Sequence, residues 1–131
     1  MGINAVLRTM PQNIPLTIRG FFAATMATAD AQTWQPPVDV YRVARGWLLK
    51  FELAGVSPDD MTVSLRGSCV IVRGVRLDRC LESGCSVHQM EIAYNVFERM
   101  IELPDDLSHA TMQWECSYGM LIVRITLESA A

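Results

Sequence analysis

Residues suited to acid–base chemistry are scarce in this chain of 131 residues. It contains two histidines, His88 and His109, and only 19% of its residues are charged. No serine stands in a Gly-x-Ser-x-Gly elbow, and there is no glycine-rich phosphate loop. The paired acids Asp59–Asp60 and Asp105–Asp106 adjoin prolines, in turns where aspartate bonds to nearby backbone. The sequence therefore predicts a binding protein and not an enzyme.

Long apolar runs and a strong net charge are also missing. No run approaches the roughly 18–20 residues that cross a bilayer. A net charge of −3 and a pI near 5.3 give no attraction to nucleic acid or to an anionic membrane. The apolar run 20–29 after Arg19 resembles the core of a signal peptide, but it is short and begins late. We expect a cytoplasmic protein without nucleic-acid or membrane partners.

The four cysteines lack the spacing of a dense disulfide scaffold. Cys69 and Cys116 lie in apolar, strand-like runs and are expected to be reduced core residues. Cys80 and Cys85 lie in a polar segment with His88 nearby, where two alternatives stand beside free thiols. One is a loop disulfide within or between subunits, and the other is a zinc site, although the spacing is not a familiar zinc pattern. We predict no metal and no cofactor.

Apolar residues, by contrast, are abundant. Half of the chain is hydrophobic, the mean hydropathy is +0.20, and there are eight methionines. One small core cannot hide this much apolar surface, so part of it is expected to face other subunits or other proteins. Methionine suits adaptable surfaces, but it also fills gaps in cores.

The pattern of prolines and turn residues divides the chain into three parts. Residues 1–35 form an N-terminal arm without a sustained period, in which a short helix over 19–29 is one alternative. Consecutive prolines at Pro36 and Pro37 mark the boundary of a domain over 36–127. Residues 128–131 are a residual C-terminal tail.

Short alternating runs separated by turns fill the domain. Strands are expected over 38–43, 47–53, 61–65, 70–72, 88–93, 96–103, 112–116 and 121–127. Ser57 is expected to cap a single helical turn that begins at Pro58. Seven to nine short strands predict an all-β fold, an immunoglobulin-like antiparallel β-sandwich with a short, mobile N-terminal arm. The polar stretch 76–87 is longer than a hairpin loop needs.

Five pieces of the domain, in order, resemble the α-crystallin domain of the small heat-shock proteins. They are Pro37–Tyr41, Phe51–Val56, Val70–Arg76, Phe97–Pro104 and Gly119–Leu121. No piece is specific alone, but five in this order over some ninety residues are.

Several positions depart from the family's pattern. Ala54 stands in place of a proline, and Ile92 in place of an arginine that helps bind the dimer. Asn95 replaces a glycine, which asparagine tolerates because it visits positive φ more readily than most residues. The sequence ends at Ala131 without the family's Ile-x-Ile anchor, so an assembly smaller than the family's large shells is expected.

The resemblance implies an ATP-independent holdase, a chaperone that binds partly unfolded client proteins and suppresses their aggregation. On the arm, the expected client contacts are Phe21, Phe22 and Met26. A sheet groove is the other candidate, although its positions are equally consistent with ordinary core; they are Val63, Leu65, Leu121 and Val123.

The resemblance also implies a homodimer that can build a larger homo-oligomer. A long loop lends a strand to the partner and covers an open sheet edge. The expected interface residues are Arg76, Leu77, Asp78, Arg79, Leu81, Glu82, Val87 and Glu91. Other functions stay open: a CS-domain-type co-chaperone or a scaffold that binds a dedicated protein partner, and a redox or metal sensor at Cys80, Cys85 and His88.

Overall fold

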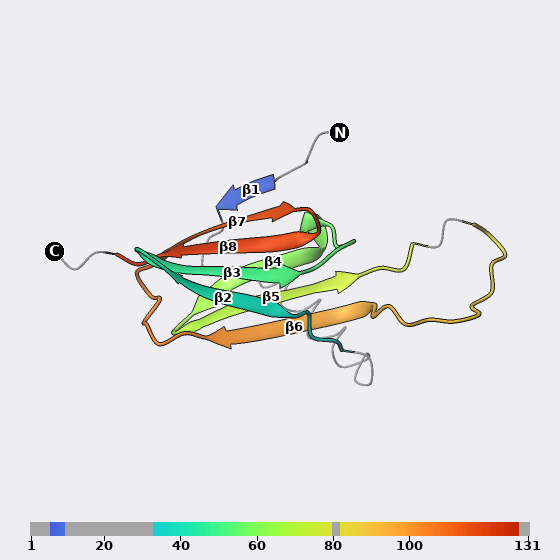
Figure 1. Ribbon diagram of the computed structural model, residues 1–131, viewed down its shortest axis with the longest axis horizontal. Helices are drawn as coiled ribbons and strands as arrows, with labels where there is room; N and C mark the ends of the chain where they lie inside the picture. Colours follow the sequence, from blue (N-terminus) through green and yellow to red (C-terminus); the bar gives the residue numbers. More distant parts are fainter. Residues whose placement is uncertain (1–5, 10–32, 80–81, 129–131) are drawn as a thin grey trace.

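The computed structural model describes residues 6–9, 33–79 and 82–128, which form two antiparallel sheets packed face to face (Figure 1). The first sheet has the order β1 (Val6–Thr9), β7 (Thr111–Ser117), β8 (Met120–Thr126), β3 (Gly46–Glu52) and β2 (Val38–Val43). The second has the order β4 (Met61–Arg66), β5 (Cys69–Arg76) and β6 (Asn95–Glu102). The predicted all-β sandwich is confirmed.

The core lies between the sheets because apolar side chains alternate along the strands. On β8, Leu121, Val123 and Ile125 are buried, while Arg124 and Thr126 between and after them are exposed. The largest fully buried side chains include Trp114, Phe51 and Phe97. Each such side chain contributes about 1.5–3 kcal/mol on burial, so this two-residue period is the main source of stability.

The predicted turn chemistry is also confirmed. The backbone N–H of Asp59 donates to Ser57 Oγ at 3.2 Å, and the short 3₁₀ helix η1 (Pro58–Asp60) follows this cap. Tyr118 and Gly119 have φ of 51° and 76°, which is the two-residue turn that matches strand twist in a hairpin. Asn95 has a φ of 73°, a positive value that asparagine adopts more readily than most residues.

The paired acids hold turns in place, as the sequence indicated. Asp105 Oδ2 accepts a hydrogen bond of 2.8 Å from Trp47 Nε1. The backbone N–H of Ser108 donates to Asp106 Oδ1 at 3.0 Å, and this hydrogen bond lowers the pKa of the Asp106 carboxyl. These carboxylates therefore have structural partners beside them.

The N-terminal part contains a strand that the sequence did not predict. Residues 6–9, which were expected to lie outside the strand pattern, form β1 and pair with β7 in the register Val6↔Cys116 to Thr9↔Gln113. Four residues are too few for an alternation to be recognised in a sequence. Pairing satisfies backbone N–H and C=O groups that β7 would otherwise leave open. The alternative helix over 19–29 lies outside the described residues.

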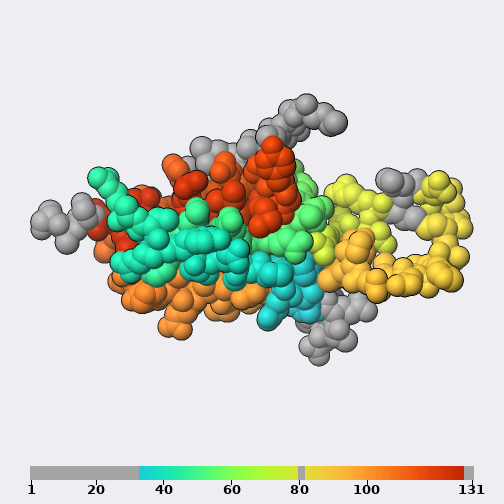
Figure 2. Space-filling view, viewed as in Figure 1, coloured from blue at the N-terminus to red at the C-terminus, as the bar shows by residue number. Residues whose placement is uncertain are grey.

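A second expectation is wrong: residues 88–93 do not form a strand. The 77–94 loop, which joins β5 to β6, runs out from the sandwich as a wide arc (Figures 1 and 2). A strand needs a neighbouring strand for its hydrogen bonds, and the described part of this chain offers none along the arc. Within the same described ranges, no helix is long and apolar enough to cross a membrane.

Candidate functional site

The 77–94 loop exposes large apolar side chains. The exposed fractions are 48% for Leu77, 70% for Val87, 55% for Met90 and 62% for Ile92. The space-filling view shows the loop projecting well beyond the body of the sandwich (Figure 2). An apolar surface that stands this far from the core is typical of a site that binds another protein chain.

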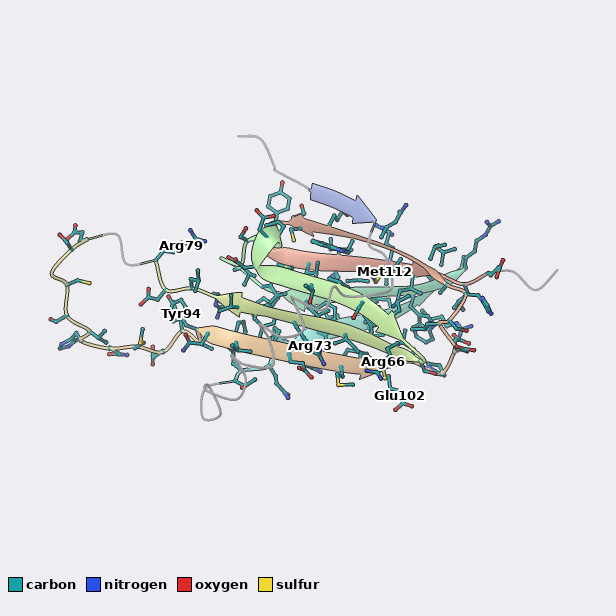
Figure 3. The ribbon with its side chains drawn as sticks, turned by 180° about the vertical axis from the view of Figure 1, so that it is seen from behind. Arg66, Arg73, Arg79, Tyr94, Glu102 and Met112 are labelled. Carbon is teal, nitrogen blue, oxygen red and sulfur yellow. The ribbon has the colours of Figure 1, made fainter. Side chains whose placement is uncertain are left out.

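Most of the interface residues predicted from the sequence lie exposed on this loop. They are Leu77, Asp78, Arg79, Glu82, Val87 and Glu91, while Leu81 lies outside the described residues. Arg76 is different, because it is partly buried and bonds to its own chain at the neck of the loop, which we define as residues 76–79 and 93–95. Figure 3 shows Arg79 and Tyr94 on the two sides of this neck. Sequence reasoning missed Met90 and named Ile92 only as a departure from the family.

A second exposed apolar surface lies on β2. Val40, Tyr41 and Val43 are 40%, 43% and 40% exposed, and β2 is the last strand of its sheet in the described part of the chain. Its outer edge therefore carries backbone groups that can pair with an added strand. The sequence predicted the strand correctly, but alternation does not reveal which strand ends a sheet.

The predicted sheet groove is part of the core. Val63, Leu65, Leu121 and Val123 are between 0% and 6% exposed and belong to the buried cluster. This is the alternative that the sequence left open, and these side chains present no surface to a client in this structure. The predicted arm contacts Phe21, Phe22 and Met26 lie outside the described residues.

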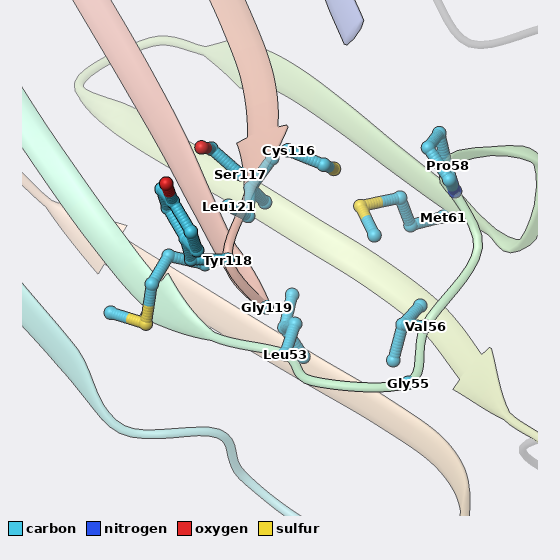
Figure 4. Close-up of a pocket in the computed structure, with 11 residues that line it drawn as sticks. Leu53, Gly55, Val56, Pro58, Met61, Cys116, Ser117, Tyr118, Gly119 and Leu121 are labelled. Carbon is cyan, nitrogen blue, oxygen red and sulfur yellow. The ribbon is translucent and has the colours of Figure 1, made fainter. Parts of the chain in front are cut away.

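An apolar hollow lies at one end of the sandwich (Figure 4). It is bounded by the turn after β3 and by the β7–β8 turn, and it is lined by Leu53, Val56, Pro58, Met61, Cys116 and Leu121, among others. Among the described residues that line it, there is no Asp, Glu, His, Lys or Arg. The hollow can therefore receive an apolar group, but it offers no pair of side chains for acid–base chemistry.

The cysteines divide into two kinds. Cys69 and Cys116 are not disulfide-bonded, as predicted, but they are half-buried and not fully in the core. Cys85 is disulfide-bonded, which agrees with the loop-disulfide alternative and removes this sulfur as a thiolate ligand for zinc. Among the residues that the structure describes, no three His, Cys, Asp or Glu side chains are grouped to hold a metal ion.

The residues that carry the family resemblance hold the fold together. Phe97 is fully buried, and its ring meets that of Trp34 edge-on with 5.4 Å between the centroids. Arg99 Nη1 donates to the carbonyl oxygen of Pro36 at 2.9 Å and so ties the segment before β2 to β6. Gly74 lies against Phe97 and the backbone of Asp60, with no room for a side chain. The motif therefore describes packing and not a catalytic site.

Comparison with known proteins agrees with this architecture. Small heat shock protein C2 of Rickettsia felis is 21% identical over 105 residues, which cover 80% of this chain and 68% of that protein. The structure of HSP18.5 from E. histolytica matches with a TM-score of 0.63 and 26% identity, over 75% of this chain and 92% of that one. The structure of hspA from Xanthomonas axonopodis matches with a TM-score of 0.63 and 25% identity, over 75% and 98% of the two chains.

The match extends to the family as a whole. The sequence model of the Hsp20/alpha crystallin family aligns with residues 39–131, which include every described strand after β2 and nearly all of β2 itself. The sandwich, the long loop between β5 and β6, and the packing of the Phe97 motif are the structural counterpart of this match. The chain belongs to the Hsp20/alpha crystallin family, that of the small heat-shock proteins.

Proposed function

We propose that this protein is an ATP-independent holdase that binds partly unfolded proteins and suppresses their aggregation. Membership of a family of chaperones that act without enzymatic chemistry is the observation that carries the proposal. Exposed apolar side chains on the 77–94 loop and on β2 support it, because a holdase works by apolar contact. The apolar composition of the chain points the same way.

Client contact is assigned to Phe21, Phe22 and Met26 of the N-terminal arm. These side chains are large and apolar, and they lie in a segment without a strand pattern of its own. Each aromatic ring offers roughly 1.5–3 kcal/mol on full burial against a client. The buried groove residues are left out of this assignment, since a client could reach them only by opening the sandwich.

The second part of the proposal is a homodimer built by the 77–94 loop, from which larger homo-oligomers can form. The loop presents Val87, Met90 and Ile92, and β2 offers an open edge with Val40 and Tyr41 beside it. A loop segment that pairs with the β2 edge of a second copy would bury both surfaces and complete the hydrogen bonds of that edge. Residues 88–93 would then form a strand by pairing with β2 of the partner.

A cytoplasmic location belongs to the same proposal. Cys69 and Cys116 are not disulfide-bonded, which fits a reducing compartment, whereas the disulfide at Cys85 argues against it. Alkylation of the thiols in intact cells, followed by mass measurement, tests this point directly. Cys85 found oxidised in cells would argue for an oxidising compartment.

Light scattering from a heat-labile enzyme, heated with and without this protein and without ATP, tests the chaperone activity. We expect suppression of scattering at a near-stoichiometric ratio. The variant Phe21→Ser with Phe22→Ser should protect less, and Tyr118→Ser, which removes an exposed aromatic ring from the sandwich, serves as the matched control.

Two results would contradict the proposal. Absence of suppression, together with tight binding to one dedicated chaperone, would identify a co-chaperone. Loss of assembly by the double variant with undiminished protection would show that the arm joins subunits and does not bind clients.

A further inference from the structure

Arg76 joins three segments at the neck of the loop. Its Nε and Nη2 donate to the carbonyl oxygen of Ala93 at 2.8 and 2.5 Å, and its Nη1 donates to the carbonyl oxygen of Ala54 at 3.1 Å. Arg76 ends β5, Ala93 lies on the returning side of the loop, and Ala54 follows β3. One guanidinium therefore links the start of the loop, its return and the neighbouring turn.

Two aromatic rings lie within cation–π distance of the same guanidinium. Arg76 Cζ lies 4.1 Å from the centroid of the Trp34 ring and 5.7 Å from that of Tyr94. Trp34 is itself fixed to the start of β6, since its N–H donates to Val96 O at 3.1 Å and its Nε1 donates to Asn95 O at 3.2 Å. Partly buried cation–π contacts of this kind strengthen the hold on the guanidinium.

Backbone pairing does not extend beyond this point. The last pair between β5 and β6 is Arg76↔Asn95, and the described residues of the loop after it form no strand. Asp60 and Arg79 lie 3.7 Å apart at the neck, but the Arg79 side chain is 67% exposed and such pairs contribute little. Arg76 thus holds both sides of the loop at the point where backbone pairing ends.

We propose that Arg76 is a positioning residue for partner binding: it fixes the loop against the sandwich so that Val87, Met90 and Ile92 face a second copy. The inference rests on the dimer proposed above, and it assigns to Arg76 a role without partner contact. A loop held in place before association loses less conformational freedom when it binds. Arg76 therefore strengthens the dimer from within one chain.

The geometry requires arginine and not only a positive charge. Arg76 gives two hydrogen bonds to one carbonyl and a third to another, while its Cζ lies 4.1 Å from the centroid of the Trp34 ring. A lysine ammonium is a compact group that cannot span both carbonyls and has no flat face to stack. Arg76→Lys thus keeps the charge and removes the bridge.

The test compares Arg76→Lys with Arg73→Lys in the full chain. Arg73 lies three residues earlier on the same strand, where its Nε donates to Glu98 Oε2 at 2.9 Å, so it is a matched control away from the neck. Sedimentation equilibrium gives the dimer dissociation constant, and ¹⁵N relaxation gives the order parameters of the Ala93 and Tyr94 amides. We expect Arg76→Lys to raise the dissociation constant about tenfold, which corresponds to about 1.4 kcal/mol.

The order parameters of both amides should fall toward flexible values, below about 0.6, in Arg76→Lys and not in Arg73→Lys. An unchanged dissociation constant with unchanged order parameters would overturn the inference. A weaker dimer with unchanged order parameters would also overturn it, because Arg76 would then contact the partner directly. If the wild-type protein is a monomer, the proposed dimer fails, and the order parameters alone decide whether Arg76 holds the loop.

Discussion

Replacing Gly74 with alanine tests how closely β5 is packed against its neighbours. A Cβ at this position would lie 2.5 Å from the carbonyl oxygen of Asp60 and 2.5 Å from Cζ of Phe97. Neither group can yield easily, because one is backbone and the other is a fully buried ring. Overpacking of a core costs about 1–3 kcal/mol, and two immovable neighbours place this variant near the upper end. Alanine also restricts the unfolded chain more than glycine does, which stabilises the folded protein by about 0.4–1 kcal/mol. The expected net loss in the free energy of unfolding is therefore about 2 kcal/mol.

Thermal unfolding followed by circular dichroism measures this loss. A domain of this size loses about 4–8 °C in Tm per kcal/mol, so we expect Gly74→Ala to unfold about 8–16 °C lower. All samples need the same concentration, because dimer formation adds to the apparent stability. Gly67→Ala is the matched control, since it adds the same methyl group where no atom lies within 4 Å, at a φ of +61°.

The control should lose about 0–1.6 kcal/mol, because the strain of a positive φ, about 1–2 kcal/mol, is opposed by the gain of about 0.4–1 kcal/mol from the unfolded chain. The packing argument is refuted if Gly74→Ala unfolds within about 2 °C of the wild type, or no lower than Gly67→Ala.

Three further predictions concern the loop and the β2 end of the sandwich. Deleting Asp78 to Ser86 should give monomers by analytical ultracentrifugation at micromolar concentration while the circular dichroism of the sandwich persists; a dimeric deletion variant would exclude strand exchange. Val87→Asp should weaken the dimer at least about tenfold, since a charge would be buried at the interface, and an unchanged dissociation constant would place Val87 outside it. Trp47→Phe removes the 2.8 Å hydrogen bond to Asp105 and should cost about 1–2 kcal/mol in urea unfolding. A double-mutant cycle with Asp105→Ala, which removes the acceptor, checks this assignment, and additive losses would rule out the coupling.

Most of the sandwich could be predicted because its strands bury one face each. Along β8 the alternation of Leu121, Val123 and Ile125 with polar neighbours is visible in the sequence. The turn residues at Ser57 and Gly119 act locally, so their roles also follow from sequence alone. Order and spacing of these pieces were enough to indicate the family.

The features that the sequence did not predict depend on contacts between distant segments. Alternation does not distinguish a strand that finds a neighbour from one that does not. The sequence therefore predicts a strand over 88–93, although the described part of the chain provides no pairing for it. The Arg76 side chain donates its hydrogen bonds to the carbonyl groups of Ala54 and Ala93, which are 22 and 17 residues away in the sequence. Nothing in the local sequence shows that these groups converge.

The pairing of β1 with β7 affects how readily the protein itself aggregates. A bare sheet edge is a template for edge-to-edge aggregation. β1 covers the β7 edge with four residues and pairs with that one strand, whereas β8 pairs with β7 over seven positions. So short a cover opens at a lower free energy than the sandwich unfolds. The chain therefore shields the β7 edge with four residues of its own N-terminal segment.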